Sequence, residues 1–118
     1  MDETLTRAVV DISGRPFLYF DGQFSGSTLL SKKQTGDITE NSVTENSMYE
    51  FQVDTIEDFW QGFTNAAGCN LHLEILRGRS DHHKIEALFK AAAKALRFAC
   101  EIDERACNSI PSTKGIIV

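Results

Sequence analysis

Short apolar runs and polar segments alternate along the first half of the chain. The runs RAVVDI and PFLYFD flank Ser13-Gly14-Arg15, and β-branched and aromatic residues on both sides of a Ser-Gly turn predict a β-hairpin. Residues 22–47 are rich in glycine, serine, threonine, asparagine and lysine, which predicts a long surface-loop insertion. The run MYEFQV at 48–53 alternates and predicts a third strand.

The segment that follows has the period of a helix. Asp54 and Glu57 are spaced as in a capping box, so the helix is expected to begin there, and Gly68 is a plausible stop. Apolar residues recur between these limits at helical spacing: Ile56, Phe59, Trp60, Phe63 and Ala67. The pattern therefore predicts one amphipathic helix of about three and a half turns.

Residues 70–77 return to the period of a strand. Leu71, Leu73 and Ile75 fall on one face, and His72 and Glu74 fall on the other. We therefore expect the His72 ring to point away from the apolar face of its strand.

The last long segment, after Gly78, is again helical. Its core-facing stripe is predicted to contain Ile85, Leu88, Phe89, Ala92, Leu96 and Ala99. Another face carries His82, Glu86, Lys90 and Arg97, because spacings of four and seven residues return to nearly the same azimuth. Asp81, near the helix start, complements the helix dipole. Lys84, Lys94 and Arg97 are expected to be solvated.

The order of these elements is β-β-β-α-β-α, within a single domain of residues 1–118. It predicts an α+β two-layer sandwich, in which a mixed sheet carries two helices on one face. The chain has 118 residues, which suffice for a core, and no internal repeat is visible.

Charge and cysteine content narrow the class of protein. The formal net charge is −5, so no basic surface for nucleic acid is expected. No apolar run approaches the roughly 20 residues of a membrane span, and no signal peptide is visible. Cys69, Cys100 and Cys107 are odd in number and lack C-x-x-C spacing, which fits the reducing cytoplasm. Cys69 and Cys100 lie in apolar contexts and are expected in the core.

All three histidines lie between positions 72 and 83. The simpler reading of His82 and His83 is that they cap the helix or face solvent, paired with Asp81 or Glu86. The clustering of all three rings with Glu86 favours a metal site instead, because imidazoles with a carboxylate are ligands for Mn, Fe, Co, Ni or Zn. Glu86 is three or four residues from each ring, and the strand-turn-helix could fold His72 back towards them. Adjacent helical residues differ by about 100° in azimuth, which favours two ions over one.

Three segments carry a resemblance to a known family. MDETLTRAVVDISGRPFLYFD resembles the M-D-E-x-L-x-R…D-x-S-G-R-P segment of imidazoleglycerol-phosphate dehydratases. LHLEILRGRSDHHKIEALFKAAAKALR is similar to the second H-H-x-x-E-A-x-F-K helix of that family and the L-H strand before it. IPSTKG resembles its C-terminal loop, although a plain turn is what this segment alone would suggest.

The resemblance implies site residues and a reaction. His72, His82, His83 and Glu86 would be manganese ligands, and Lys90, Ser112 and Lys114 would hold the phosphate of a small-molecule substrate. The implied reaction is the dehydration of imidazole glycerol phosphate to imidazole acetol phosphate in histidine biosynthesis, by a lyase without an organic cofactor. Glu86 is also a candidate for assisting proton transfer.

The chain corresponds to only the second of the family's two similar halves. The resemblance implies that the sites form between subunits of a homo-oligomer, so a second copy or a first-half partner would have to supply the missing ligands. An alternative function is therefore a metal-binding or oligomerising half-domain without catalysis. A further alternative is another metalloenzyme, such as a hydrolase, that uses the same ligands.

Overall fold

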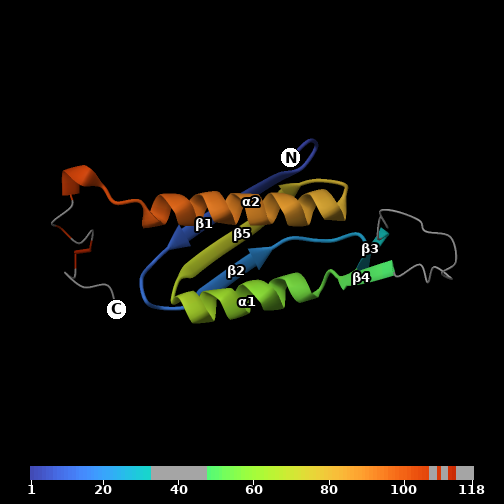
Figure 1. The fold of residues 1–118 in the computed structure, drawn as a ribbon, viewed down its shortest axis with the longest axis horizontal. Coiled ribbons are helices and arrows are strands. Elements are labelled where there is room, and N and C mark those ends of the chain that lie inside the picture. Colours follow the sequence, from blue (N-terminus) through green and yellow to red (C-terminus); the bar gives the residue numbers. More distant parts are fainter. Residues whose placement is uncertain (33–47, 107–108, 110–111, 114–118) are drawn as a thin grey trace, which may run out of the picture.

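The computed structural model describes residues 1–32, 48–106, 109 and 112–113. Its elements are β1 (Leu5–Asp11), β2 (Phe17–Asp21), β3 (Thr28–Lys32), β4 (Met48–Gln52), α1 (Thr55–Ala67), β5 (Asn70–Arg77), α2 (Asp81–Cys100) and the short 3₁₀ helix η1 (Glu104–Ala106). The predicted α+β class is confirmed, with one strand more than the predicted order (Figure 1).

The main sheet has three strands in the order β1-β5-β2. The prediction of a β1–β2 hairpin was wrong, because β5 lies between the two strands, antiparallel to β1 and parallel to β2. The sheet is therefore mixed, as predicted. A central position suits β5, since Leu71 and Leu73 on its inner face are fully buried and its backbone groups find partners along both edges.

β3 and β4 form a separate antiparallel two-stranded sheet. β4 confirms the predicted third strand. The prediction of a loop over residues 22–47 was wrong for Thr28–Lys32, which pairs with β4, while 33–47 lie outside the described residues. The loop prediction relied on polar composition, and pairing with a distant strand outweighed it.

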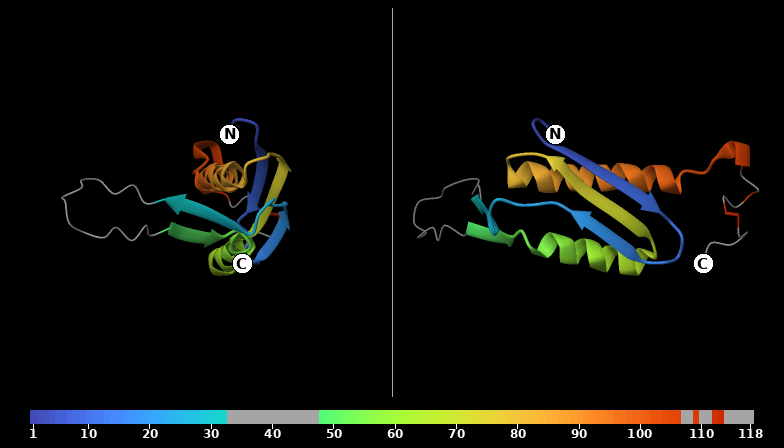
Figure 2. Two further views of the ribbon diagram at one scale, coloured as in Figure 1. Left: turned by 90° about the vertical axis from the view of Figure 1, so that its right-hand side faces the viewer. Right: turned by 180° about the vertical axis from the view of Figure 1, so that it is seen from behind.

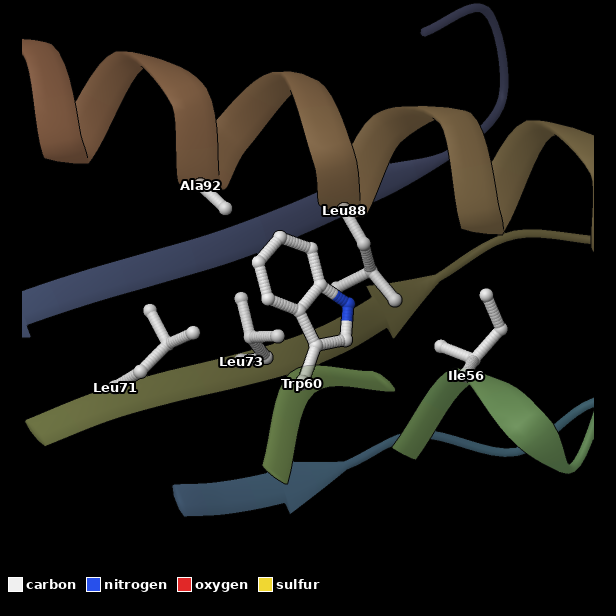
Figure 3. Packing of buried hydrophobic residues seen from close by; sticks show 6 residues of the cluster. All are labelled: Ile56, Trp60, Leu71, Leu73, Leu88 and Ala92. Carbon is white, nitrogen blue, oxygen red and sulfur yellow. The ribbon is translucent and has the colours of Figure 1, made fainter. Parts of the chain in front are cut away.

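Both helices cover the same face of the main sheet, as predicted (Figures 1 and 2). The core between the two layers consists of Ile56, Trp60, Leu71, Leu73, Leu88 and Ala92 (Figure 3). Within the described chain, neither helix has the length and apolar composition needed to cross a bilayer.

α1 ends as predicted but begins differently. Gly68 adopts a left-handed conformation with φ 60°, and its N–H bonds to the Thr64 carbonyl. Asp54 has helical dihedral angles and its side chain makes no cap hydrogen bond, so the predicted capping box is absent. At this end the Thr55 hydroxyl instead donates to the Gln52 carbonyl at 2.6 Å.

Only some of the residues predicted to lie in the core are buried. Cys69 is buried as predicted, and burial raises the pKa of its thiol. Cys100 is exposed, which corrects its assignment to the core, and Cys107 lies outside the described residues. Phe59 is 51% exposed and Ala99 is also exposed, so the apolar stripes of both helices extend beyond the surface that the sheet covers.

Candidate functional site at the start of α2

The first turns of α2 present two histidines and a carboxylate at the surface. Ser80 caps the helix, and its hydroxyl accepts a hydrogen bond from the His83 N–H at 3.3 Å. His82 and His83 lie in the first turn, and Glu86 lies about one turn later. The cap thus fixes where the helix begins and at which positions of its first turn the two histidines lie.

His82, Glu86 and Lys90 form a chain of contacts along one face of α2. His82 Nε2 lies 3.3 Å from Glu86 Oε2, and Lys90 Nζ lies 2.6 Å from Glu86 Oε1. The hydrogen bond from Lys90 lowers the pKa of Glu86, and the charges of Lys90 and His82 add to the effect. Glu86 is therefore a carboxylate at neutral pH. The predicted common face of these residues is confirmed.

His83 points towards two acidic residues at the start of the chain. Its Nδ1 atom lies 3.0 Å from Glu3 Oε2, and its Nε2 atom lies 3.9 Å from Asp2 Oδ2. One ligand atom from each of the three side chains lies within 4.8 Å of the other two. No other group of this kind occurs among the described residues. The rings of His82 and His83 are 6.1 Å apart between centroids.

Glu3 also joins the N-terminus of the chain to the turn before α2. Its Oε1 atom accepts hydrogen bonds from the N–H groups of Arg79 and Ser80, both at 3.1 Å, and from the Thr4 hydroxyl. The hydrogen bond from the His83 ring, together with these backbone donors, holds the pKa of Glu3 far below its ordinary value. Neither Asp2 nor Glu3 was predicted to belong to the site, although both are part of the M-D-E motif.

Lys84 was expected in solvent but is buried. Its side chain is 7% exposed, and Nζ lies 3.0 Å from Asp81 Oδ1 and 2.9 Å from the Gln23 carbonyl. Asp81 also accepts hydrogen bonds from the N–H groups of Ser25 and Gly26. Burial alone would raise the pKa of Asp81, but these donors and Lys84 lower it below its ordinary value. The cluster ties the chain after β2 to the helix that carries the site.

His72 does not approach the start of α2 within one chain. The alternation along β5 turns Leu71 and Leu73 towards the helices, so His72 lies on the opposite face of the sheet. Its ring contacts those of Phe17 and Tyr19, with centroids 6.0 and 5.4 Å away. The predicted exposure on the non-apolar face is confirmed, but the predicted fold-back of the ring towards the helix is not.

The predicted phosphate-binding residues divide into two groups. Lys90 projects from the same face of α2 as Glu86, and its side chain is 63% exposed. Ser112 is described, whereas Lys114 lies outside the described residues. The C-terminal segment leaves α2 at the end opposite His82 and His83, and η1 lies beyond that end (Figure 1). Lys90 therefore lies within α2, whereas Ser112 belongs to the segment that follows η1.

The donor atoms at the start of α2 suit a divalent transition metal. Imidazole nitrogens with carboxylate oxygens form the ligand set of Mn²⁺, Fe²⁺ and Zn²⁺ sites. The described residues place such donors together twice, at His82 with Glu86 and at His83 with Asp2. Each set offers fewer protein ligands than a closed site requires, so a complete site needs further ligands.

Comparisons with known proteins identify relatives over almost the whole chain. Residues 1–96 match the family described as imidazoleglycerol-phosphate dehydratase. A Psychrobacter protein named imidazoleglycerol-phosphate dehydratase is 46% identical over 114 residues, which are 97% of this chain and 46% of that protein. An Acinetobacter baylyi protein of the same name is 45% identical over 98% of this chain and 48% of its own length. The chain spans about half the length of the curated relatives it matches.

Solved structures agree with these sequence relatives. The imidazoleglycerol-phosphate dehydratase of Staphylococcus aureus superposes with a TM-score of 0.63 at 37% identity, over 84% of this chain and 47% of that one. The Pyrococcus furiosus structure gives a TM-score of 0.64 at 28% identity, over 98% of this chain and 52% of that one. The described fold therefore corresponds to about half of each solved chain.

Proposed function

This chain belongs to the imidazoleglycerol-phosphate dehydratase family, and we propose that it supplies one half of a metal-dependent dehydratase of histidine biosynthesis. The substrate would be imidazole glycerol phosphate and the product imidazole acetol phosphate, formed by loss of water. The observation that carries the proposal is the surface array of His82, His83 and Glu86 on the first turns of α2. We place the enzyme in the cytoplasm.

We assign the metal ligands to His82, His83 and Glu86, with His72 as a ligand from another protomer. His72 lies on the sheet face opposite α2, so it would serve a site completed by a neighbouring subunit. A bound Mn²⁺ ion would supply Lewis-acid stabilisation of negative charge on the imidazole ring of the substrate. No organic cofactor is needed for this chemistry.

The remaining residues would bind the substrate and move its proton. The proton to be removed is on the carbon beside the imidazole ring and is only weakly acidic. Glu86 is ionised, so it can ligate the metal or accept a proton at neutral pH. Lys90 is exposed next to Glu86, where its ammonium group can bind the substrate phosphate, and Ser112 and Lys114 would add contacts from the C-terminal segment.

A metal-binding experiment tests the ligand assignment. The double substitution His82→Ala with His83→Ala should abolish Mn²⁺ binding, measured by elemental analysis, while circular dichroism shows unchanged secondary structure. His72→Ala tests the fourth ligand separately, because it removes an imidazole from the opposite sheet face and should also lower the metal content. If the double variant keeps its full metal content, the assignment is wrong. If His72→Ala keeps full metal content, only the assignment of His72 is wrong.

A second candidate function is a half-domain that binds metal and oligomerises without catalysis. The match of these 118 residues to about half of each relative motivates it, because a second set of ligands would have to come from outside them. Turnover of imidazole glycerol phosphate should be measured for the chain alone and after mixing with a separately produced first half. Activity only in the mixture supports the dehydratase half, and no activity in either supports the non-catalytic domain. Sedimentation with and without chelator would show whether metal ions bridge the subunits.

A further inference from the structure

We propose that Glu3 is a positioning residue for His83. Its carboxylate holds the His83 ring in the Nδ1–H tautomer and leaves Nε2 as the nitrogen able to bind a ligand. The inference rests on the proposed function only in identifying that ligand as a divalent cation. The tautomer and orientation of the ring follow from contacts within the chain. Glu3 itself would not touch the metal or the substrate.

The hydrogen bonds of the Glu3 carboxylate fix the direction of its contact with His83. Oε1 already accepts from three donors, the N–H groups of Arg79 and Ser80 and the Thr4 hydroxyl. The carboxylate acts as an acceptor in all of these bonds, and Oε2 lies 3.0 Å from His83 Nδ1. An ionised carboxylate can only accept, so the ring nitrogen must carry the hydrogen.

The other ring nitrogen is placed differently. His83 Nε2 lies 3.9 Å from Asp2 Oδ2, which is beyond hydrogen-bond distance. Within the described residues, no hydrogen bond is made to Nε2. In histidine metal sites the nitrogen that does not bind the metal commonly donates to a carboxylate, which fixes the tautomer and the orientation of the ring. Glu3 occupies this carboxylate position, and Asp2 lies on the open side of the ring.

The same carboxylate holds the backbone that carries the ring. Arg79 and Ser80 form the turn before α2, and Ser80 caps the helix through the His83 N–H. Glu3 therefore fixes both the backbone and the side chain of this ligand from a segment 80 residues earlier in the sequence. This double attachment distinguishes His83 from His82, whose ring makes its ion pair and its ring contact with residues of α2 itself.

The isosteric substitution Glu3→Gln provides a directional test. Three donors surround Oε1, so the glutamine oxygen should take that position and the amide nitrogen should replace Oε2. The amide would then donate to Nδ1, which moves the ring hydrogen to Nε2. The tautomer of His83 should therefore invert rather than average. Glu74→Gln is the matched control, because Glu74 also accepts a side-chain hydrogen bond, from Arg7, but lies on β5.

The tautomer should be read by ¹⁵N NMR of the metal-free, histidine-labelled chain at a pH where titration shows a neutral ring. The chain has only three histidines, so single substitutions assign the signals. We expect Nδ1–H in the unsubstituted protein and in Glu74→Gln, and Nε2–H in Glu3→Gln. An Nε2–H tautomer in the unsubstituted protein overturns the inference, even if no variant folds.

Calorimetric titration with Mn²⁺ then separates this inference from the proposed function. Glu3→Gln should weaken binding by about 10- to 100-fold, as is usual for a partner of a metal ligand, while Glu74→Gln leaves it unchanged. An inverted tautomer with unchanged Mn²⁺ affinity overturns the positioning role. If neither the unsubstituted protein nor any variant binds Mn²⁺ but the tautomers follow expectation, the proposed metal-dependent function is wrong. The effect of Glu3 on the His83 ring is still supported in that case.

Discussion

Lys84 and Asp81 form an ion pair one helical turn apart, on the buried side of α2, with 3.0 Å between Nζ and Oδ1. Both side chains are less than 10% exposed. The pair also makes hydrogen bonds with the backbone of residues 23–26, where Lys84 donates to a carbonyl and Asp81 accepts from two N–H groups. Removing either partner of such a buried pair should destabilise the protein, but the two losses should differ in size.

Asp81→Asn should destabilise the protein by about 3–5 kcal/mol, because it leaves the buried Lys84 ammonium without an opposite charge. The measurement is the free energy of unfolding from urea denaturation. Glu101→Gln is the matched control, since it breaks the exposed pair with Arg97 at the C-terminal end of α2 and should have little effect. Lys84→Met should cost less than Asp81→Asn, because Asp81 keeps its two backbone donors. Equal losses for Asp81→Asn and Glu101→Gln would contradict the buried pair.

Acid should destabilise the folded protein through the same aspartate. The pKa of Asp81 is lower in the folded state than its ordinary value of about 3.9, so its ionised form stabilises the fold above that pH. This contribution is lost as the pH falls through the lowered pKa. The urea midpoint should therefore change little between about pH 7 and pH 5 and fall below about pH 4. Asp81→Asn should show a shallower fall, and an identical pH profile would argue against this linkage.

Two glycines in and after α1 should respond oppositely to alanine. Gly68 has φ 60°, where a side chain is disfavoured, so Gly68→Ala should destabilise by roughly 1–2 kcal/mol. Gly62 lies within α1 with open space around its Cα, so Gly62→Ala should stabilise by about 0.5–1 kcal/mol. Thermal unfolding of both variants measures this difference. A loss of stability in both would mean that the C-terminal conformation of α1 is not the cause.

Lys90→Ala should weaken substrate binding in the assembled enzyme and raise KM more than it lowers kcat. The reason is that the proposed contact is with the phosphate, away from the bond that breaks. Lys94→Ala is the matched control, because Lys94 is an exposed lysine of α2 one turn further on. Steady-state kinetics should be compared for the substrate and a dephosphorylated analogue. Equal losses with both compounds would exclude a phosphate contact.

The periodicity of the sequence predicted the helices and β5 because their burial depends on local spacing. Leu71, Leu73 and Leu88 occupy the buried positions that the pattern assigned to them. Lys84 was predicted to be in solvent because it is charged, although its position around the helix axis indicated burial. It lies four residues before Leu88 and eight before Ala92, so it shares their buried face.

Contacts between distant segments could not be predicted in this way. The turn at Ser13-Gly14-Arg15 suggested a hairpin, but strand pairing was decided by β5, more than 50 residues later. The partnership of Glu3 with His83 is of the same kind, since it joins residues 80 positions apart in the sequence. The histidine pair and Glu86 were found because they lie within two helical turns of one another. The place of His72 across the sheet depends on which face the helices cover.

The position of β5 between β1 and β2 also determines when the main sheet can form during synthesis. During synthesis, β1 and β2 leave the ribosome before β5, the strand with which both of them pair. Their edges therefore stay unpaired with β5 until residue 77 has been synthesised. Such long-range closure slows folding relative to a local hairpin of the same size. Newly made chains halted before that residue would be prone to aggregation, and a chaperone would gain most by shielding them during this interval.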